Sequence, residues 1–266
     1  MRVNRDQSAE PRLSRPLVRL FNRYSRGYLR RHFHAVRLLE THAMRADYAA
    51  LPVVVFFNHP SWWDPLVTLI LAEKYFPERS AFGPIDAVAL QRYGFLRHLG
   101  FFGVQPNSAR GASEFLRTAT EILASPQRML WLTPQGKFAD ARTRPVSFQR
   151  GLAHLAGRVA PAVFLPLAIE YTFWEERLPE VLVAFGMPIF TQQHQDSCGV
   201  SDWAAALEGT LQDTQDALAT AAQRRQSDEW EVLLRGGAGT AKVYDLWRRA
   251  RAAIRREPFR PEHSTL

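Results

Sequence analysis

The chain has 266 residues, of which 46% are hydrophobic, and it carries a formal net charge of +8. Its one cysteine, Cys198, excludes an internal disulfide, and no paired Cys or His residues have the spacing of a structural zinc site. No run of about 18 or more apolar residues predicts a membrane-spanning helix. The N-terminal region also lacks the apolar stretch of a secretory signal, so we expect a protein that is not secreted.

Residues 1–45 are predicted to form a basic amphipathic arm. Residues 1–50 hold 11 Lys and Arg against 4 Asp and Glu, which accounts for 7 of the 8 net positive charges. Apolar residues recur there at three- and four-residue spacing, which predicts a helix with one apolar face. These residues are Leu17, Leu20, Phe21, Tyr24, Tyr28, Leu29, Phe33 and Val36.

A basic helix with aromatic residues on one face is typical of an element that lies on anionic membrane surfaces. A helix packed on the folded domain is an equally good interpretation, and both can hold if the helix uses two edges. Binding of nucleic acid is a third interpretation, but we find no base-reading module in the rest of the chain. We therefore expect peripheral contact with an anionic membrane, at its cytoplasmic face, and no nucleic-acid partner.

The segment that follows, residues 51–65, contains the most informative motif. Leu51 to Phe57 is a continuous apolar run, typical of a strand buried on both faces. His59 and Asp64 follow where this strand turns into a predicted helix, and a turn can bring the carboxylate onto one imidazole nitrogen. The pair would then serve as a general base, because the carboxylate fixes the tautomer and stabilises the imidazolium. Two simpler interpretations remain: Asp64-Pro65 as a helix start, and His59 as a buried histidine bonded to backbone.

The remaining elements alternate between strand and helix patterns. This alternation predicts an α/β fold: a single domain with a central mixed, largely parallel sheet flanked by helices, preceded by the basic amphipathic helical segment. We divide the chain into the arm (1–45), a catalytic domain (46–225) and a helical C-terminal extension (226–266). Strands are expected at 101–104, 129–132, 162–169 and 181–185, and helices at 65–75, 112–123, 148–159, 203–225 and 242–256, with a polar loop at 191–201 and a glycine hinge at 236–239.

Several blocks in this order resemble the PlsC-type glycerolipid acyltransferases. Asn58-His59 with Asp64 resembles the family's Asn-His-x4-Asp block, and Leu132 to Phe138 lies where its Phe-Pro-Glu-Gly-Thr-Arg block would fall. The resemblance runs from about Leu51 to Gly186 and also includes residues 99–104, 148–153 and 163–168. It implies an O-acyltransferase that uses acyl-CoA or acyl-carrier-protein as co-substrate and needs no cofactor.

The resemblance also implies roles for individual residues. His59 is the expected base that removes a proton from the acceptor hydroxyl, and Asp64 orients His59; no metal is expected. The apolar residues Trp62, Trp63 and Leu66 are near enough in sequence to line a slot for the acyl chain, although core packing is an equal alternative. The substrate-binding residues implied are Asn58, Asn107, Gln135, Gly136, Lys137 and Pro166.

The departures from the family pattern concern the acceptor. Pro106 and Phe138 stand where the family has two arginines that are thought to hold the acceptor's phosphate, and Gln135 replaces a glutamate. Because arginine suits bidentate phosphate recognition, we expect a different acceptor, a lipid or glycolipid hydroxyl. Two alternatives remain: a thioesterase or esterase that activates water, and a non-catalytic lipid-binding relative. Nearby cations that could substitute for the arginines are Arg110, Lys137, Arg142 and Arg144.

Overall fold

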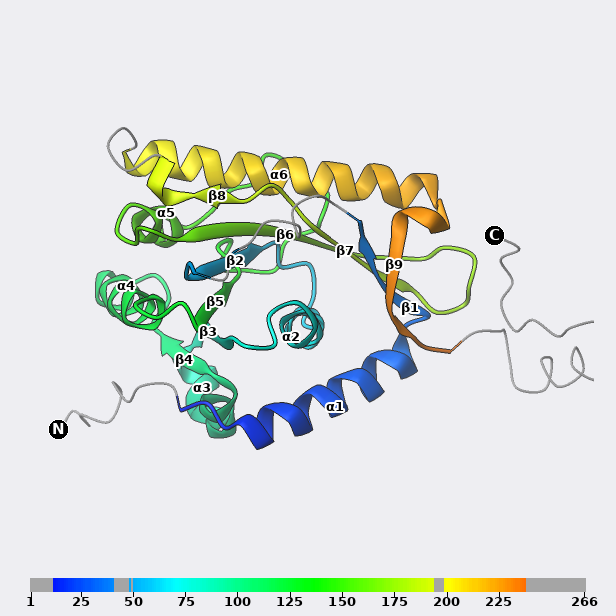
Figure 1. The fold of residues 1–266 in the computed structure, drawn as a ribbon, viewed down its shortest axis with the longest axis horizontal. Helices are drawn as coiled ribbons and strands as arrows, with labels where there is room; N and C mark the ends of the chain where they lie inside the picture. Colours follow the sequence, from blue (N-terminus) through cyan, green and yellow to red (C-terminus); the bar gives the residue numbers. More distant parts are fainter. Residues whose placement is uncertain (1–11, 41–47, 49, 194–198, 238–266) are drawn as a thin grey trace, which may run out of the picture.

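The computed structural model describes residues 12–40, 48, 50–193 and 199–237. Within them, one mixed sheet lies between two layers of helices (Figure 1). The strands are β1 Ala35–Leu39, β2 Val53–Phe57, β3 Ser80–Asp86, β4 Phe101–Val104, β5 Arg128–Leu132, β6 Val163–Thr172, β7 Glu180–Phe185, β8 Ile189–Phe190 and β9 Trp230–Arg235. Their order in the described sheet is β4-β3-β5-β2-β6-β7-β1-β9, with β8 paired to β6.

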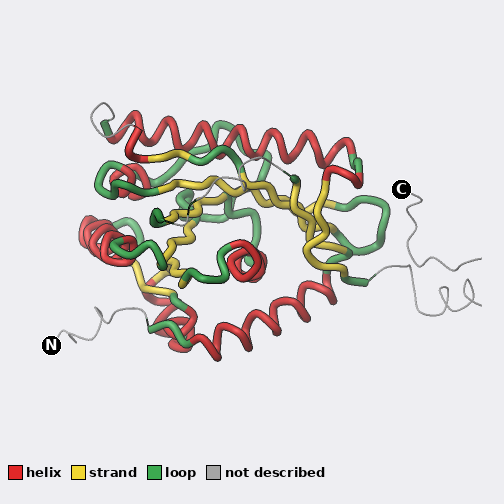
Figure 2. Tube along the Cα trace, in the orientation of Figure 1, coloured by secondary structure: helices red, strands yellow, loops and turns green. Residues whose placement is uncertain are grey.

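The helices cover both faces of this sheet. They are α1 Arg15–His32, α2 Asp64–Tyr75, α3 Ala87–Arg92, α4 Ala109–Leu123, α5 Gly151–Ala156 and α6 Val200–Arg224, with short 3-10 turns η3 Gly94–Leu99, η4 Thr191–Gln193 and η5 Ser227–Glu229. In Figure 2 the yellow strands separate α6 on one side from α1 and α2 on the other. None of the helices in the described ranges is long and apolar enough to cross a membrane.

Five neighbouring strands, β4, β3, β5, β2 and β6, run parallel, so their carboxyl ends meet at one edge of the sheet. The other half is mixed, because β6 pairs antiparallel with β7 and β1 pairs parallel with β7 but antiparallel with β9. The expected fold class, an α/β domain with a mixed, largely parallel sheet, is confirmed. The carboxyl edge is where parallel α/β sheets commonly carry their ligand sites.

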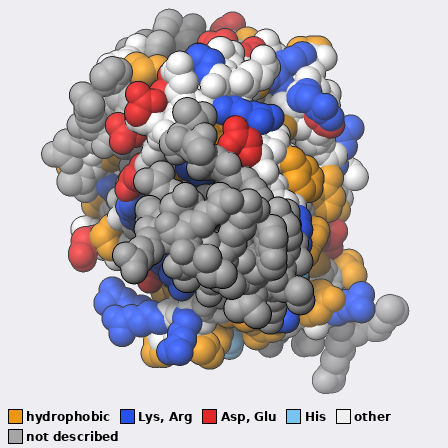
Figure 3. All heavy atoms as spheres, turned by 90° about the vertical axis from the view of Figure 1, so that its right-hand side faces the viewer, with side chains coloured by type: hydrophobic (Ala, Val, Ile, Leu, Met, Phe, Trp, Pro, Cys, Tyr) orange, Lys and Arg blue, Asp and Glu red, His pale blue; other side chains and the backbone are white. Residues whose placement is uncertain are grey.

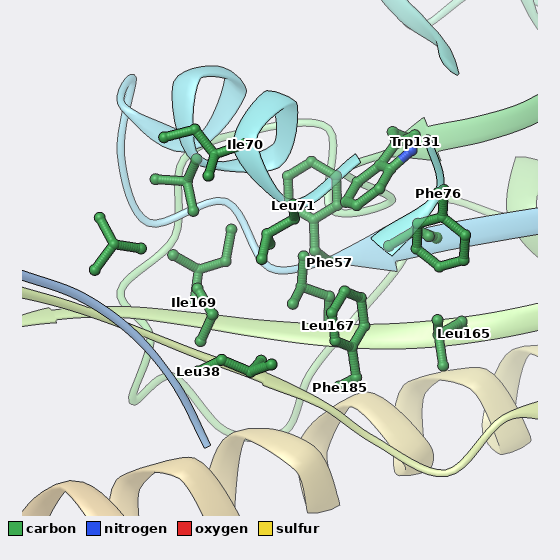
Figure 4. Close-up of a cluster of buried hydrophobic side chains, with 14 of the residues drawn as sticks. Leu38, Phe57, Ile70, Leu71, Phe76, Trp131, Leu165, Leu167, Ile169 and Phe185 are labelled. Atoms are coloured by element: carbon green, nitrogen blue, oxygen red, sulfur yellow. The ribbon is translucent and has the colours of Figure 1, made fainter. Parts of the chain in front are cut away.

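The valine- and phenylalanine-rich strand β2 lies in the middle of the sheet and is buried along its whole length. Its side chains alternate between two cores, as the two-residue period of a strand requires. Val53, Val55 and Phe57 pack towards α1 and α2, whereas Val54 and Phe56 pack towards α4, α5 and α6. Figure 4 shows part of the first core, where residues of α2 meet residues of the sheet.

The structure corrects two predictions about the ends of the domain. Helix α1 ends at His32, and the segment expected to continue it to Val36 forms strand β1 in the sheet. Residues 230–235, which we expected in a helical extension, form strand β9 on the outer side of β1. In both segments a short apolar run fits the spacing of a helix as well as that of a strand. Pairing with distant strands therefore decides which of the two forms.

Smaller differences concern the lengths of predicted elements. The segment around Gly83-Pro84, for which the sequence indicated no element, forms β3 followed by α3, and the helix expected at 148–159 is limited to Gly151–Ala156. The helix expected at 242–256 lies outside the described residues. The same is true of parts of the expected loop at 191–201 and of the expected hinge at 236–239.

Candidate active site

The turn after β2 is fixed to the neighbouring strand by Asn58. Its carboxamide donates a hydrogen bond to the Ile169 carbonyl of β6 and accepts one from the Ile169 N–H, both at 2.8 Å. A side chain thus continues the strand pairing past the end of β2. Asn58 is buried, and these two bonds show that it positions the turn; its contact with substrate stays a prediction.

His59 and Asp64 meet as their spacing predicted. The imidazole Nδ1 lies 2.6 Å from the Asp64 Oδ2, and the Ser61 N–H donates to the same oxygen at 3.2 Å. Asp64 is the first residue of α2 and Pro65 the second, so the helix starts here as expected, but Trp63 and not Asp64 is the N-cap residue. A carboxylate is favourable at this end of a helix.

The side chains of His59 and Asp64 differ in their exposure to solvent. The Asp64 side chain is 0% exposed, whereas the His59 side chain is 21% exposed. With Nδ1 taken as the donor to Asp64, Nε2 is left as the proton acceptor. The arrangement can therefore take a proton from a group outside and stabilise the charge that forms on the ring.

Asp64 has a further partner that the sequence did not reveal. The Tyr171 hydroxyl, from the end of β6, donates to Asp64 Oδ1 at 2.6 Å. Burial, followed by the charge and the hydrogen bond of Asp64, holds the pKa of Tyr171 well above its ordinary value. Tyr171 lies two residues beyond Ile169 on the same strand face, and no motif in the sequence joins a tyrosine to a carboxylate at this separation.

The loop after β5 holds the His59 turn from the other side. Gln135 Oε1 accepts a hydrogen bond from the His59 N–H at 3.0 Å, and the Ala139 N–H donates to the His59 carbonyl at 3.0 Å. Gly136 has a φ of 68°, and an added Cβ would approach Gln149 Nε2 to 2.7 Å. Its N–H is bonded to the Thr133 carbonyl at 3.1 Å, so Gly136 serves the turn.

The ring of Phe138 lies against one face of the His59 imidazole. Its ring lies 4.3 Å from the His59 ring, measured between centroids, at an interplanar angle of 33°. The side chain is 60% exposed. An apolar, accessible ring thus stands beside the imidazole, at the position where the family resemblance places an arginine.

The other predicted site residues are spread over the region. Asn107 lies exposed, with a φ of 55°, in the turn between β4 and α4 at the same edge of the sheet. Lys137 is exposed in the loop after β5. Pro166 is buried in β6 opposite Phe56, which is a core position, and its contact with substrate stays a prediction.

The arginines considered as phosphate-binding substitutes all have carboxylate partners. Arg110 pairs with Glu114 at 2.9 Å, Arg142 with Asp140 at 2.7 Å and Arg144 with Asp216 at 2.5 Å. None of these pairs involves His59 or Asp64. Within the described ranges, no group of three or more His, Cys, Asp or Glu side chains is placed to hold a metal ion.

Comparison with known proteins identifies the class. A protein-family model described as Acyltransferase matches residues 37–170, just over half of the chain. The chain therefore belongs to this acyltransferase family, and the resemblance to its PlsC-type members is confirmed. The matched range includes the His–Asp turn and ends one residue before Tyr171.

Seven chains of solved structures resemble the fold. One is the 1-acyl-sn-glycerophosphate (LPA) acyltransferase PlsC from Thermotoga maritima, which superimposes with a TM-score of 0.54 and 13% sequence identity. The match covers 77% of this chain and 79% of the PlsC chain. A search of curated protein sequences found no match.

Proposed function

We propose that the protein moves a fatty acyl group from an acyl thioester to a hydroxyl group of a lipid or glycolipid acceptor, with His59 as general base. One observation carries the proposal: in a chain of the acyltransferase family, a partly exposed imidazole is hydrogen-bonded to a buried carboxylate at the carboxyl edge of the sheet. The donor would be acyl-CoA or acyl-carrier-protein, and the reaction needs no cofactor.

The proposed reaction has two proton transfers at one nitrogen. His59 Nε2 takes the proton of the acceptor hydroxyl while that oxygen attacks the thioester carbonyl. When the tetrahedral intermediate collapses, the carbon–sulfur bond breaks and the imidazolium returns the proton to the leaving thiolate. Asp64 supports the imidazolium between these steps, and general-base catalysis of this kind contributes about 10² to 10⁴-fold.

Phe138 supports an acceptor without a phosphate next to the reacting hydroxyl. An arginine at this position would offer paired donors to a phosphate, whereas the phenyl ring offers an apolar face 4.3 Å from the imidazole. Such a face suits acyl-chain carbons or the apolar face of a sugar ring. The neighbouring cations Arg142 and Arg144 are engaged with Asp140 and Asp216.

The surface beside the site supports peripheral membrane contact. Leu20 and Tyr24 of α1 are 64% and 54% exposed, and Trp62, three residues after His59, is 56% exposed. Ring contacts connect Tyr24 and Trp62 through Tyr28, whose ring centroid lies 5.6 Å from that of Tyr24 and 6.0 Å from that of Trp62. Figure 3 shows basic and apolar side chains side by side along the lower edge of one face, at the height of α1 in Figure 1. An acceptor could thus reach His59 from an anionic bilayer at the cytoplasmic face.

An acceptor panel tests the proposal. Purified protein is incubated with labelled palmitoyl-CoA and vesicles that contain monoacylglycerol, a glycolipid or lysophosphatidate, and the labelled products are identified. We expect an acylated glycolipid or neutral lipid to form faster than phosphatidate. Free palmitate as the sole product would support the hydrolytic alternative and contradict acyl transfer, and preference for lysophosphatidate would contradict the proposed acceptor class.

A further inference from the structure

The second oxygen of the buried acid has a donor of its own. Tyr171 donates to Asp64 Oδ1, while His59 and the Ser61 N–H use Oδ2. We infer that Tyr171 is a positioning residue, which aims the Asp64 carboxylate at His59 and limits how tightly that carboxylate holds the imidazolium. The inference rests on the proposed function, because it assigns Tyr171 a part in the work of the His–Asp pair.

The position of the Tyr171 hydroxyl is fixed from several directions. Its strand is paired with β7, where Tyr171 lies opposite Val181. The Asn58 carboxamide holds Ile169, two residues earlier on the same strand face. The Tyr171 ring packs against Phe33, with 5.6 Å between centroids. The hydroxyl is thus placed by the pairing of β6 and by Phe33 at the end of α1, on a strand other than the one that leads into His59.

The hydroxyl can act here only as a donor. Burial and the neighbouring Asp64 charge raise the pKa of Tyr171 well above its ordinary value, so the phenol stays protonated throughout the working pH range of an acyltransferase. A hydrogen bond to a carboxylate stabilises its charged form and so lowers its pull on a further proton. Without the phenol, Asp64 Oδ1 loses its donor, and the carboxylate would attract the Nδ1–H of His59 more strongly.

Other titratable groups belong to the elements around this contact. His32 of α1 lies against Trp63, at 5.3 Å between ring centroids. Asp140 follows Ala139 in the loop behind His59, and hydrogen bonds from Arg142 hold the pKa of its carboxyl below the ordinary value. Glu170 belongs to the opposite face of β6, because side chains alternate along a strand. Loss of the Tyr171 hydroxyl changes none of these groups directly.

The test compares Tyr171→Phe with a matched control, Tyr75→Phe. Tyr75 also donates to a carboxylate, Glu231 Oε2, at 2.5 Å, at the other end of α2. In Tyr171→Phe we expect kcat to fall about tenfold, the lower end of what losing an outer partner of a functional histidine costs at metal sites, with KM little changed. The acidic limb of the kcat/KM profile should move to higher pH. The downfield proton NMR signal of His59 Nδ1–H should also shift, since its bond to Asp64 changes.

The control should keep the wild-type pH profile and NMR signal even if its stability falls. A Tyr171→Phe protein with the same pH profile and the same Nδ1–H signal as Tyr75→Phe would overturn the inference. His59→Ala separates the two claims: if it retains acyl transfer, the proposed function fails, and the NMR signal alone then decides whether Tyr171 tunes the pair.

Discussion

Asp64 is the fully buried member of the proposed His–Asp pair. Burial of an isolated carboxylate costs several kcal/mol, so such a group persists only when it is paired and hydrogen-bonded. Asp64 has an imidazole, a phenol and a backbone N–H as partners. Removal of one partner from a buried pair typically costs about 3–5 kcal/mol; here His59 is partly exposed, so water can replace the imidazole in part.

Phe138 provides a test of acceptor choice. In Phe138→Arg we expect kcat/KM for lysophosphatidate to rise about tenfold relative to a neutral lipid acceptor, since one charge-assisted contact is worth about 1.5–3 kcal/mol. The ratio of the two rates is the measurement. Met187→Arg, which places the same charge at an exposed position between β7 and β8, is the control. Equal ratios in both variants would contradict a role for Phe138 in acceptor choice.

Glu170 gives a prediction about stability and pH. Burial raises the pKa of its carboxyl above the ordinary value. The folded state thus binds the proton more tightly than the unfolded state, and its stability falls as pH rises from the ordinary carboxyl pKa to the raised value. Glu170→Gln cannot ionise at this position. Relative to wild type, its free energy of unfolding should therefore show no gain at low pH, a gain that grows through that window, and a constant gain above it. Urea denaturation across the pH range tests this; an advantage independent of pH would contradict it.

The sequence was sufficient for the local part of the site and insufficient for its distant partners. His59 and Asp64 are five positions apart across one turn, so their contact followed from spacing and block order. Tyr171 is 107 positions from Asp64, and its placement depends on the pairing of β6. The bond of Asn58 to Ile169 was not predictable for the same reason, because Ile169 is 111 positions away.

At the scale of elements, one edge of α1 is buried in the core and another is exposed. Leu29 is fully buried in the core beneath α2, whereas Leu20 is 64% exposed beside Tyr24. The repeated apolar spacing predicted a helix but did not show which residues of the stripe would be covered. The structure thus shows packing at one edge of α1 and exposed apolar residues at another, while contact of the exposed edge with a membrane stays a prediction.

A pair of alanine variants separates these edges. Leu29→Ala should lower the free energy of unfolding by about 2–5 kcal/mol, because it leaves a cavity in the core. Leu20→Ala should leave stability within about 0.5 kcal/mol of wild type and weaken flotation with anionic vesicles. Thermal unfolding and vesicle flotation of both proteins are the measurements. Unchanged flotation of Leu20→Ala would argue against membrane contact through this edge.

At the scale of the molecule, the sheet extends beyond the parallel half that carries the site. Strand β9 covers β1, and Trp230 and Leu234 bury their side chains there. The predicted boundary at residue 226 failed because both strands are short and their partners are remote in sequence. The parallel half was predictable, since its strands alternate with helices along the chain. The fold therefore includes residues 230–235, which the local sequence pattern assigned to a separate C-terminal extension.

Two truncations measure what β9 contributes. A chain ending at Arg225 lacks the strand, and one ending at Gly237 retains it. The shorter protein should be less stable by at least about 3 kcal/mol, the value of two large buried side chains, and should aggregate more readily through the exposed edge of β1. Equal unfolding free energies of the two proteins would show that β9 is not part of the cooperative fold.

The most direct measurement of the central claim is the rate of acyl transfer by His59→Ala. With labelled palmitoyl-CoA and the best acceptor of the panel, the variant should keep its fold by circular dichroism and lose about 10² to 10⁴-fold in kcat. A folded His59→Ala protein that forms the acylated product at the wild-type rate would contradict the account.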